Sequence, residues 1–232
     1  MLWYFVIMLP PLIFMIWAQI KVSSTYKKYS QITNMSGFSG NQAASRLLAY
    51  NGLNEVRIEG TKGHLTDHYD PRSKVLRLSA DVANRQSVAA LGIVAHEVGH
   101  AAQDKFGYGP MKLRSALVPV ANIGSQFGFI LVIIGIVLFG LNIALGATMA
   151  WIGVGLFGAA VLFALVTLPV ELNASNRARQ MLQGAGMVST REFEGASAVL
   201  SAAALTYVAA LLQAVAQLFY FLLLVGGMRR SD

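Results

Sequence analysis

Two histidines and a glutamate stand close together in the segment His96-Glu97-Val98-Gly99-His100. On a helix, residues four apart leave nearly the same face one turn apart, so His96 and His100 can hold one metal ion together. Glu97, one position further along, can act on a water molecule beside that metal. Chance would produce this pattern roughly 0.002 times in a chain with so few histidines and glutamates. The motif therefore predicts a single Zn²⁺ site suited to hydrolysis.

A catalytic zinc ion needs a third protein ligand and one open position. The chain contains no cysteine, which excludes a thiolate ligand and a cysteine nucleophile. Two predicted membrane spans separate His100 from Glu171, which places both on the same side of the bilayer. A carboxylate at the end of a span is costly unless it is paired or bound to a metal, which favours Glu171. The candidates for the third ligand are His64, His68, Asp67, Asp70, Asp104 and Glu171.

The elements that position these residues follow from an uneven distribution of charge. Of the 232 residues 55% are hydrophobic and 12% are charged, against about 25% charged in an average soluble domain. Residues 1–20, 115–170 and 195–228 carry no charge at all. A span needs ~20 apolar residues, so four spans are expected, one of which contains Pro10-Pro11 and should kink there or begin a second short helix. They lie near 2–20, 118–140, 149–169 and 207–225.

The composition excludes a simple soluble globule and a disordered chain. Residues 1–20 have no basic residue before their apolar run, which favours a membrane anchor over a cleaved secretory signal. We expect a transmembrane helix over 1–20, a catalytic domain over 21–114, a transmembrane hairpin over 115–170, a helical segment with the third ligand over 171–206, and a last transmembrane helix with a basic tail over 207–232.

The polar domain is predicted to be a small α+β unit. Ser39 should cap a helix that runs to about Tyr50 and ends at Gly52. Strands are expected over 55–59, 64–69 and 74–79 as a short antiparallel sheet, followed by one long helix over 80–105. Ser189 and Glu192 match a capping box. The predicted fold class is therefore a mainly α membrane protein with about four transmembrane helices and a small α+β catalytic domain.

Several segments together suggest a family. The residues 96–100, the stretch 169–178 (Pro-Val-Glu-Leu-Asn-Ala-Ser-Asn-Arg-Ala), the stretch 63–71 and the stretch 204–210 resemble the YugP-type neutral zinc metallopeptidases of bacterial membranes. The resemblance covers nearly the whole chain. It implies a zincin-like catalytic domain and kinship with the membrane-embedded gluzincins, the clan of the heat-shock protease HtpX and the CAAX prenyl proteases.

In that clan the third ligand is the Glu of an E-x-x-A-D pattern, which the resemblance places at Glu171. Ala174 matches the Ala of the pattern, whereas Ser175 stands where the clan has Asp. Asn173 stands where an Asp is expected in many YugP-type sequences. Both departures concern groups that orient the metal ligands rather than the ligands themselves.

Other residues have a catalytic and a structural interpretation. Residues 64, 66 and 68 of a strand would share a face, so His68 or His64 could stabilise an oxyanion, anchor a glutamate, or be a turn histidine bonded to Asp70. Tyr207 could also donate to the oxyanion, although tyrosines are common at membrane interfaces. Asp104 is expected to be a helix-surface carboxylate.

The predicted function is a membrane-embedded zinc endopeptidase that acts on membrane or membrane-proximal polypeptides. The expected partners are a polypeptide substrate and the lipid bilayer, with no nucleic acid. The resemblance implies a bacterial plasma-membrane protein, and the basic residues at the span ends favour a cytoplasmic catalytic side. The alternatives are a zinc-stabilised membrane scaffold or partner-binding subunit without hydrolysis, which would not need Glu97, and a transporter, for which the spans offer little polar pathway.

Overall fold

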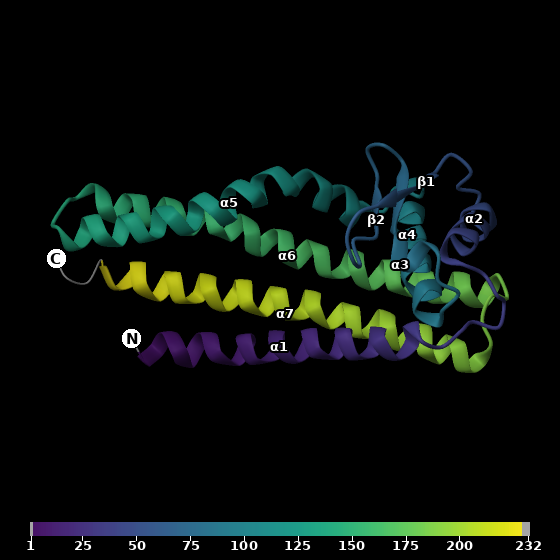
Figure 1. Cartoon of the computed structure of the whole chain (residues 1–232). Coiled ribbons are helices and arrows are strands. Elements are labelled where there is room, and N and C mark those ends of the chain that lie inside the picture. Colours follow the sequence, from purple (N-terminus) through teal and green to yellow (C-terminus); the bar gives the residue numbers. More distant parts are fainter. Residues whose placement is uncertain (1, 229–232) are drawn as a thin grey trace. The chain divides into compact units, whose positions relative to one another are not determined.

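The computed structural model describes residues 2–228, and its fold is mainly α with one small sheet (Figure 1). The elements in chain order are α1 (Leu2–Ser30), α2 (Gly40–Tyr50), β1 (Arg57–Thr61), β2 (His68–Asp70), β3 (Val75–Ser79), α3 (Ala80–Ala83), α4 (Val88–Lys105), α5 (Gly109–Gly140), α6 (Leu145–Gly184) and α7 (Thr190–Met228). They fall into two compact units.

The membrane unit comprises, among the described residues, 2–17, 112–168 and 207–228. Its charged residues in the described part are Lys112 and Arg114 alone. Helices α1, α5, α6 and α7 are each long and apolar enough to cross a bilayer. The chain is therefore an integral membrane protein with four candidate spans, as the distribution of charge predicts.

Glycines allow α5 and α6 to approach closely within the membrane unit. A Cβ on Gly128 would lie 2.7 Å from the backbone nitrogen of Phe157, and one on Gly153 would lie 2.6 Å from that of Val132. Close backbone approach at small residues is a common way for helices to associate in lipid, where the hydrophobic effect adds little. The 115–170 region thus forms a tightly packed hairpin, with a turn at 141–144 between the helices.

The prolines do not divide the spans. Pro10 and Pro11 lie inside the continuous helix α1, so the second short helix considered for residues 10–20 is not present. Pro119 and Pro169 likewise lie inside α5 and α6. Helices that cross membranes tolerate proline because local adjustments and neighbouring groups can satisfy the freed carbonyls.

The polar unit comprises residues 18–111 and 169–206. Its sheet has the strand order β1-β3-β2, in which β1 is parallel to β3 and β2 is antiparallel to β3. The sheet is therefore mixed, and the prediction of an antiparallel sheet was wrong for β1. Residues 62–67 carry the chain from one side of β3 to the other before β2 begins, which makes β3 the central strand.

The second strand is shorter than predicted because the chain turns before it. Gly63 has φ +105° and Leu65 has φ +53°, values that extended backbone does not adopt. His64 consequently lies in a loop, and only His68 belongs to β2. The proposal that residues 64, 66 and 68 share one strand face was wrong for this reason.

The helix predicted over 80–105 is two helices, α3 and α4. Residues 86–88 pair instead with the chain after α1: the Asn34 N–H donates to the Gln86 carbonyl, and the Val88 N–H donates to the Ile32 carbonyl. This pairing uses backbone groups that a continuous helix would need. The Ser87 hydroxyl then caps α4 by accepting from the Ala90 N–H.

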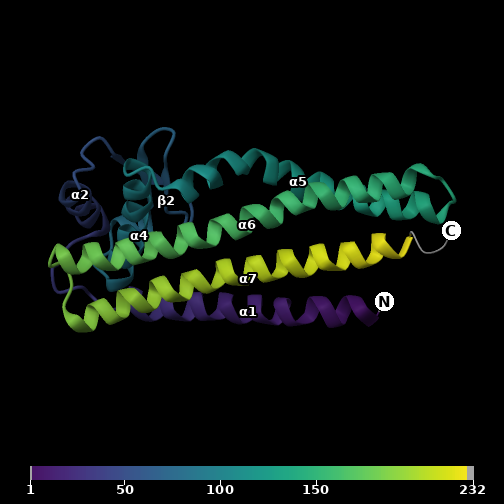
Figure 2. The same cartoon turned by 180° about the vertical axis from the view of Figure 1, so that it is seen from behind.

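The predicted helix caps are present. Ser39 and Gln42 form a capping box at the start of α2, and Gly52 follows the helix with φ +65°. Ser189 and Glu192 form a second box at the start of α7, just after the turn that reverses the chain from α6 (Figure 2). These local signals fix where the helices of the polar unit begin and end.

Candidate metal centre

Helix α4 carries the His-Glu-x-x-His motif through the interior of the polar unit. Fourteen of its eighteen residues are buried, including Glu97 and His100. Small residues such as Gly92, Ala95 and Gly99 let neighbouring elements approach it on several sides. The motif is therefore held on a rigid element rather than on a loop, as the sequence predicts.

The carboxylate of Glu171 lies directly against both histidines. Its Oε2 is 3.1 Å from Nε2 of His96 and 3.6 Å from Nε2 of His100, and only 2% of the Glu171 side chain is exposed. In a tetrahedral zinc site with bonds of ~2.05 Å, ligand atoms are about 3.3 Å apart. The donor set of two imidazoles and a carboxylate is one that zinc prefers, so these three residues fit a zinc ion.

A close contact between α4 and α6 brings Glu171 to this position. A Cβ on Gly99 would lie 2.7 Å from the carbonyl oxygen of Ala174, so the two backbones touch where Gly99 has no side chain. Gly99 lies between the two histidines, and Ala174 lies one turn after Glu171. Ala174 of α6 is therefore the residue that the missing side chain of Gly99 admits.

Gln103 determines how the His100 ring is oriented. It is fully buried, and its Nε2 donates to the Val170 carbonyl at 2.8 Å and to Asn173 Oδ1 at 3.0 Å. A carbonyl can only accept, so Gln103 Oε1 must face Nδ1 of His100, 2.9 Å away. His100 therefore carries a proton on Nδ1 and turns Nε2 toward Glu171.

The second histidine is oriented in a similar way. The hydroxyl of Ser175 lies 3.2 Å from Nδ1 of His96, so Ser175 is placed to orient this ring. Asn173 binds both Gln103 and the Arg177 guanidinium, whose Nε donates to Asn173 Oδ1 at 2.8 Å. Ser175 and Asn173 thus both have a hydrogen-bonding role beside the His96, His100 and Glu171 group.

These contacts leave electron-rich atoms facing each other. If His100 carries its proton on Nδ1 alone, then its Nε2 lone pair and the Glu171 carboxylate oxygen both point into the same small space. Acceptors at 3.6 Å need a cation between them, either a proton or a metal ion. Burial lowers the pKa of His100, but hydrogen bonding and charge from Glu171, with the charge of Glu97, outweigh it and raise that pKa. The acceptor atoms of His100 and Glu171 therefore favour a bound cation.

Glu97 lies beside this group and is held by strand β2. The backbone N–H of Tyr69 donates to Glu97 Oε2 at 3.1 Å. Burial raises the pKa of Glu97, while the neighbouring His96 and His100 act in the opposite direction. A buried carboxyl with a raised pKa and one fixed hydrogen bond is suited to accepting a proton and releasing it again.

The other candidates for the third ligand lie elsewhere. Among the described residues, the single group of three or more metal-ligating side chains is His96, His100 and Glu171. Asp67 accepts from Ser79, and Asp70 accepts from Arg72, Ser73 and Arg77. Asp104 is partly buried, where it accepts from the Tyr69 hydroxyl at 2.8 Å and pairs with Lys74.

The remaining candidates for catalysis are placed as follows. His68 is exposed, and its Nδ1 lies 2.8 Å from the Thr66 carbonyl. His64 lies 2.7 Å from the Asp81 carboxylate, so neither histidine is bonded to Asp70. Tyr207 belongs to the membrane unit, whereas the metal-ligating group belongs to the polar unit. Gln103 was missed from the sequence, although its position three residues after His100 on the same helix was a usable signal.

A buried His-His-Glu group on two helices of a membrane protein, with a second glutamate beside it, defines the class of membrane metallopeptidases. Residues 4–226 match the family described as "putative neutral zinc metallopeptidase", and the chain belongs to that family. It is 44% identical over 208 residues, 90% of each chain, to the "Putative membrane protease YugP" of Bacillus subtilis (strain 168). No solved structure matches the chain.

Proposed function

We propose that the protein is a zinc-dependent endopeptidase of the gluzincin type that holds one zinc ion through His96, His100 and Glu171. One observation carries the proposal. Glu171 of α6 follows His100 by 71 positions, yet its Oε2 lies at distances from both histidine Nε2 atoms that suit a tetrahedral site. Membership of a zinc metallopeptidase family supports the choice of metal and of reaction.

The chemistry divides between the metal and the side chains. Zinc, when bound, would lower the pKa of a water molecule and polarise the scissile carbonyl. Glu97 accepts the proton of the attacking water and later delivers it to the leaving amine. The Tyr69 N–H holds the Glu97 carboxylate in one orientation during both transfers. Either His68 or Tyr207 would donate to the oxyanion as it forms.

Strand β2 is the element that we propose receives the substrate. Tyr69 donates its N–H to Glu97 and not to β3, so the free edge of β2 faces the proposed base. An extended peptide that added to this edge would bring its carbonyl groups past Glu97 and the histidines. We infer that the substrates are membrane or membrane-proximal polypeptides, because Glu171 follows the apolar run of α6 by a single position.

We further propose that the protein lies in a bacterial plasma membrane with its catalytic side in the cytoplasm. Basic residues near the span ends are concentrated on the catalytic side of the sequence: Lys21, Lys27, Lys28, Lys112, Arg114, Arg177 and Arg179. The positive-inside rule assigns such a side to the cytoplasm. The opposing pair Arg229 and Arg230 lies outside the described residues. A membrane-impermeant label directed to a tag at the N-terminus tests this orientation.

The experiment that tests the function replaces the proposed base. Glu97→Gln should keep stoichiometric zinc, measured by elemental analysis of the purified full-length protein, and lose cleavage of an unfolded model polypeptide by at least 100-fold. Glu59→Gln, the same change on an exposed β1 side chain, is the matched control and should cleave as the parent does. A chelator should abolish cleavage by the parent.

Two results would count against the proposal. Cleavage by Glu97→Gln at the parent's rate would remove Glu97 from the mechanism. Stoichiometric zinc with no chelator-sensitive cleavage in the parent would favour the alternative of a zinc-stabilised scaffold or partner-binding subunit.

A further inference from the structure

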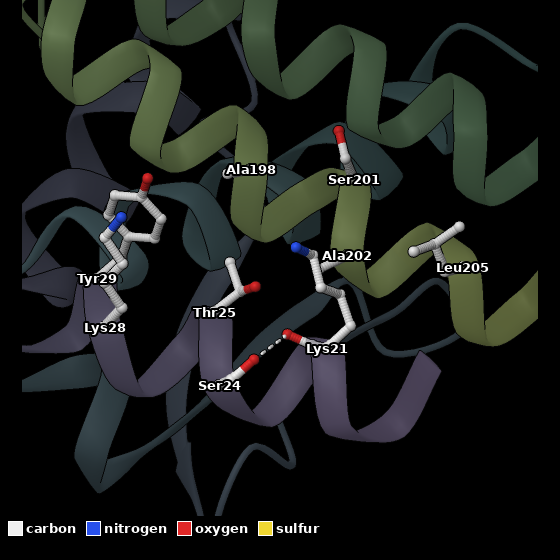
Figure 3. A pocket seen from close by; sticks show the side chains of 9 residues that line it. All are labelled: Lys21, Ser24, Thr25, Lys28, Tyr29, Ala198, Ser201, Ala202 and Leu205. Atoms are coloured by element: carbon white, nitrogen blue, oxygen red, sulfur yellow. Dashed lines mark hydrogen bonds between the residues drawn. The ribbon is translucent and has the colours of Figure 1, made fainter. Parts of the chain in front are cut away.

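A basic pocket separates α1 from α7 within the polar unit (Figure 3). Its volume is about 550 Å³, enough for a phosphate group together with its first substituents. Lys21, Thr25, Lys28 and Tyr29 line it from α1, and Ser201 and Ala202 line it from α7. No residue of the metal centre contributes to this pocket, so it is a separate site.

The pocket exists because α1 and α7 touch at one end of it and α7 carries small residues along it. A Cβ on Gly195 would lie 2.6 Å from the ring of Tyr29, so α7 and α1 are in contact there. One and two turns further along α7, Ala198 and Ala202 line the gap with side chains too short to fill it. The Lys21 side chain extends from α1 toward α7 (Figure 3).

The charged side chains that line the pocket are both lysines. Lys21 and Lys28 line it, and Lys28 has its ammonium group 5.0 Å from the Tyr29 ring centroid. The guanidinium of Arg179 donates to the Ser201 hydroxyl at 2.9 Å and so adds a third cation at the rim. No carboxylate lines the pocket, and among the described residues none of these three cations is within ion-pair distance of a carboxylate.

The hydroxyl groups and the spacing suit a phosphate ligand. Lys21, Thr25 and Lys28 follow each other at intervals of four and three, so they share one face of α1. Thr25 and Ser201 add hydroxyl donors to the two ammonium groups. Clustered lysines with hydroxyl donors are a typical environment for a phosphate oxygen.

The position of Lys21 identifies the source of that phosphate. Lys21 is the first charged residue after twenty uncharged ones on a helix that is apolar enough to cross a bilayer. Such a residue lies at the level of the lipid headgroups. We propose that this pocket binds the phosphate of an anionic phospholipid, held by Lys21 and Lys28 with Thr25 and Ser201.

The experiment uses the full-length protein in a neutral detergent. Its thermal unfolding is followed while phosphatidylglycerol, phosphatidylcholine of the same acyl chains, or sodium phosphate is added. Phosphatidylglycerol should raise the unfolding temperature with a saturable dependence, and the other two should not. Native mass spectrometry should show one retained phosphatidylglycerol molecule.

The variants compare two adjacent lysines on one helix. Lys28→Gln and Lys21→Gln should each raise the half-maximal phosphatidylglycerol concentration about fivefold. Lys27→Gln makes the same change in charge on an exposed residue outside the pocket and should leave that concentration unchanged. Ala198→Leu narrows the pocket with no change in charge and should also weaken the effect.

Three results would overturn the proposal. Equal effects of Lys27→Gln and Lys28→Gln would show a non-specific attraction to negative charge. Equal stabilisation by phosphatidylcholine would show that the anionic headgroup is not recognised. Saturating stabilisation by sodium phosphate alone would show that the ligand is a soluble anion.

Discussion

Adding one methyl group at Gly99 should disrupt the metal centre while leaving every ligand in the sequence. The new Cβ of Gly99→Ala would lie 2.7 Å from the Ala174 carbonyl oxygen. An ordinary contact of this kind is about 3.4 Å or more, so α4 and α6 must separate by roughly 0.7 Å. That shift would move a ligand pair from the ~3.3 Å of tetrahedral zinc to about 4 Å.

The expected consequence is a large loss of zinc affinity with a small loss of stability. Zinc sites accept distance errors of about 0.2 Å, and disturbed surroundings typically cost 10–100-fold in metal affinity. Overpacking costs about 1–3 kcal/mol, whereas replacing a helical glycine by alanine contributes about 1 kcal/mol. We therefore expect the metal-free protein to be destabilised by about 0–2 kcal/mol.

Gly92→Ala is the matched control on the same helix. Gly92 is also buried, but a Cβ there would meet its nearest atoms, all of Ala196, at 3.4–3.5 Å. It should gain helix stability and bind zinc as the parent does. The assay is competition with a chromogenic chelator for zinc, followed by thermal unfolding of the metal-free forms. Equal zinc affinity of Gly99→Ala and Gly92→Ala would refute the reasoning that the α4–α6 contact sets the ligand geometry.

Two further predictions concern groups that support the site and the sheet. Gln103→Met keeps the volume but leaves Nδ1 of His100 without its partner and removes one hydrogen bond to the Val170 carbonyl, so zinc affinity should fall about 10–100-fold in the same competition assay. The control Gln86→Met, at an exposed residue, should have no effect. Hydrogen bonds from Ser73, Arg72 and Arg77 lower the pKa of Asp70 to about 2. A carboxyl group whose pKa is lowered by folding stabilises the folded state at pH values above its pKa of ~3.9 in the unfolded chain. This contribution is lost as the pH falls through about 2. Asp70→Asn should therefore cost about 1 kcal/mol at pH 7, after allowance for solvent screening, and its difference from the parent in thermal unfolding should disappear between pH 4 and pH 2; a constant difference across that range would contradict the assignment.

The helices and their ends could be predicted from the sequence because their signals are local. Uncharged runs predict the spans, and Ser39 and the pair Ser189–Glu192 predict helix starts. The meeting of Glu171 with the two histidines could be anticipated because an even number of crossings returns the chain to one side. Each of these inferences depends on neighbours in sequence or on counting spans.

The sequence-based predictions were wrong or incomplete where tertiary packing or local backbone conformation determines the structure. The parallel pairing of β1 with β3 depends on the path of residues 62–67, which no short pattern specifies. The left-handed Leu65 interrupts the predicted strand, although leucine itself favours no such conformation. The amide of Gln103 is fixed only once α6 packs on α4 and supplies the Val170 carbonyl, so its residue type alone does not distinguish it from other buried polar side chains.

The separation of 75 positions between His96 and Glu171 also sets an order of events during synthesis. At ~5–20 residues per second the ribosome completes His96 roughly 4–15 s before Glu171. In that interval the nascent chain has both histidines but lacks the carboxylate, and the hairpin of α5 and α6 must enter the bilayer before the end of α6 can pack on α4. On the proposed function, a chain that failed to insert would remain an inactive precursor, so membrane insertion itself would control when hydrolysis begins.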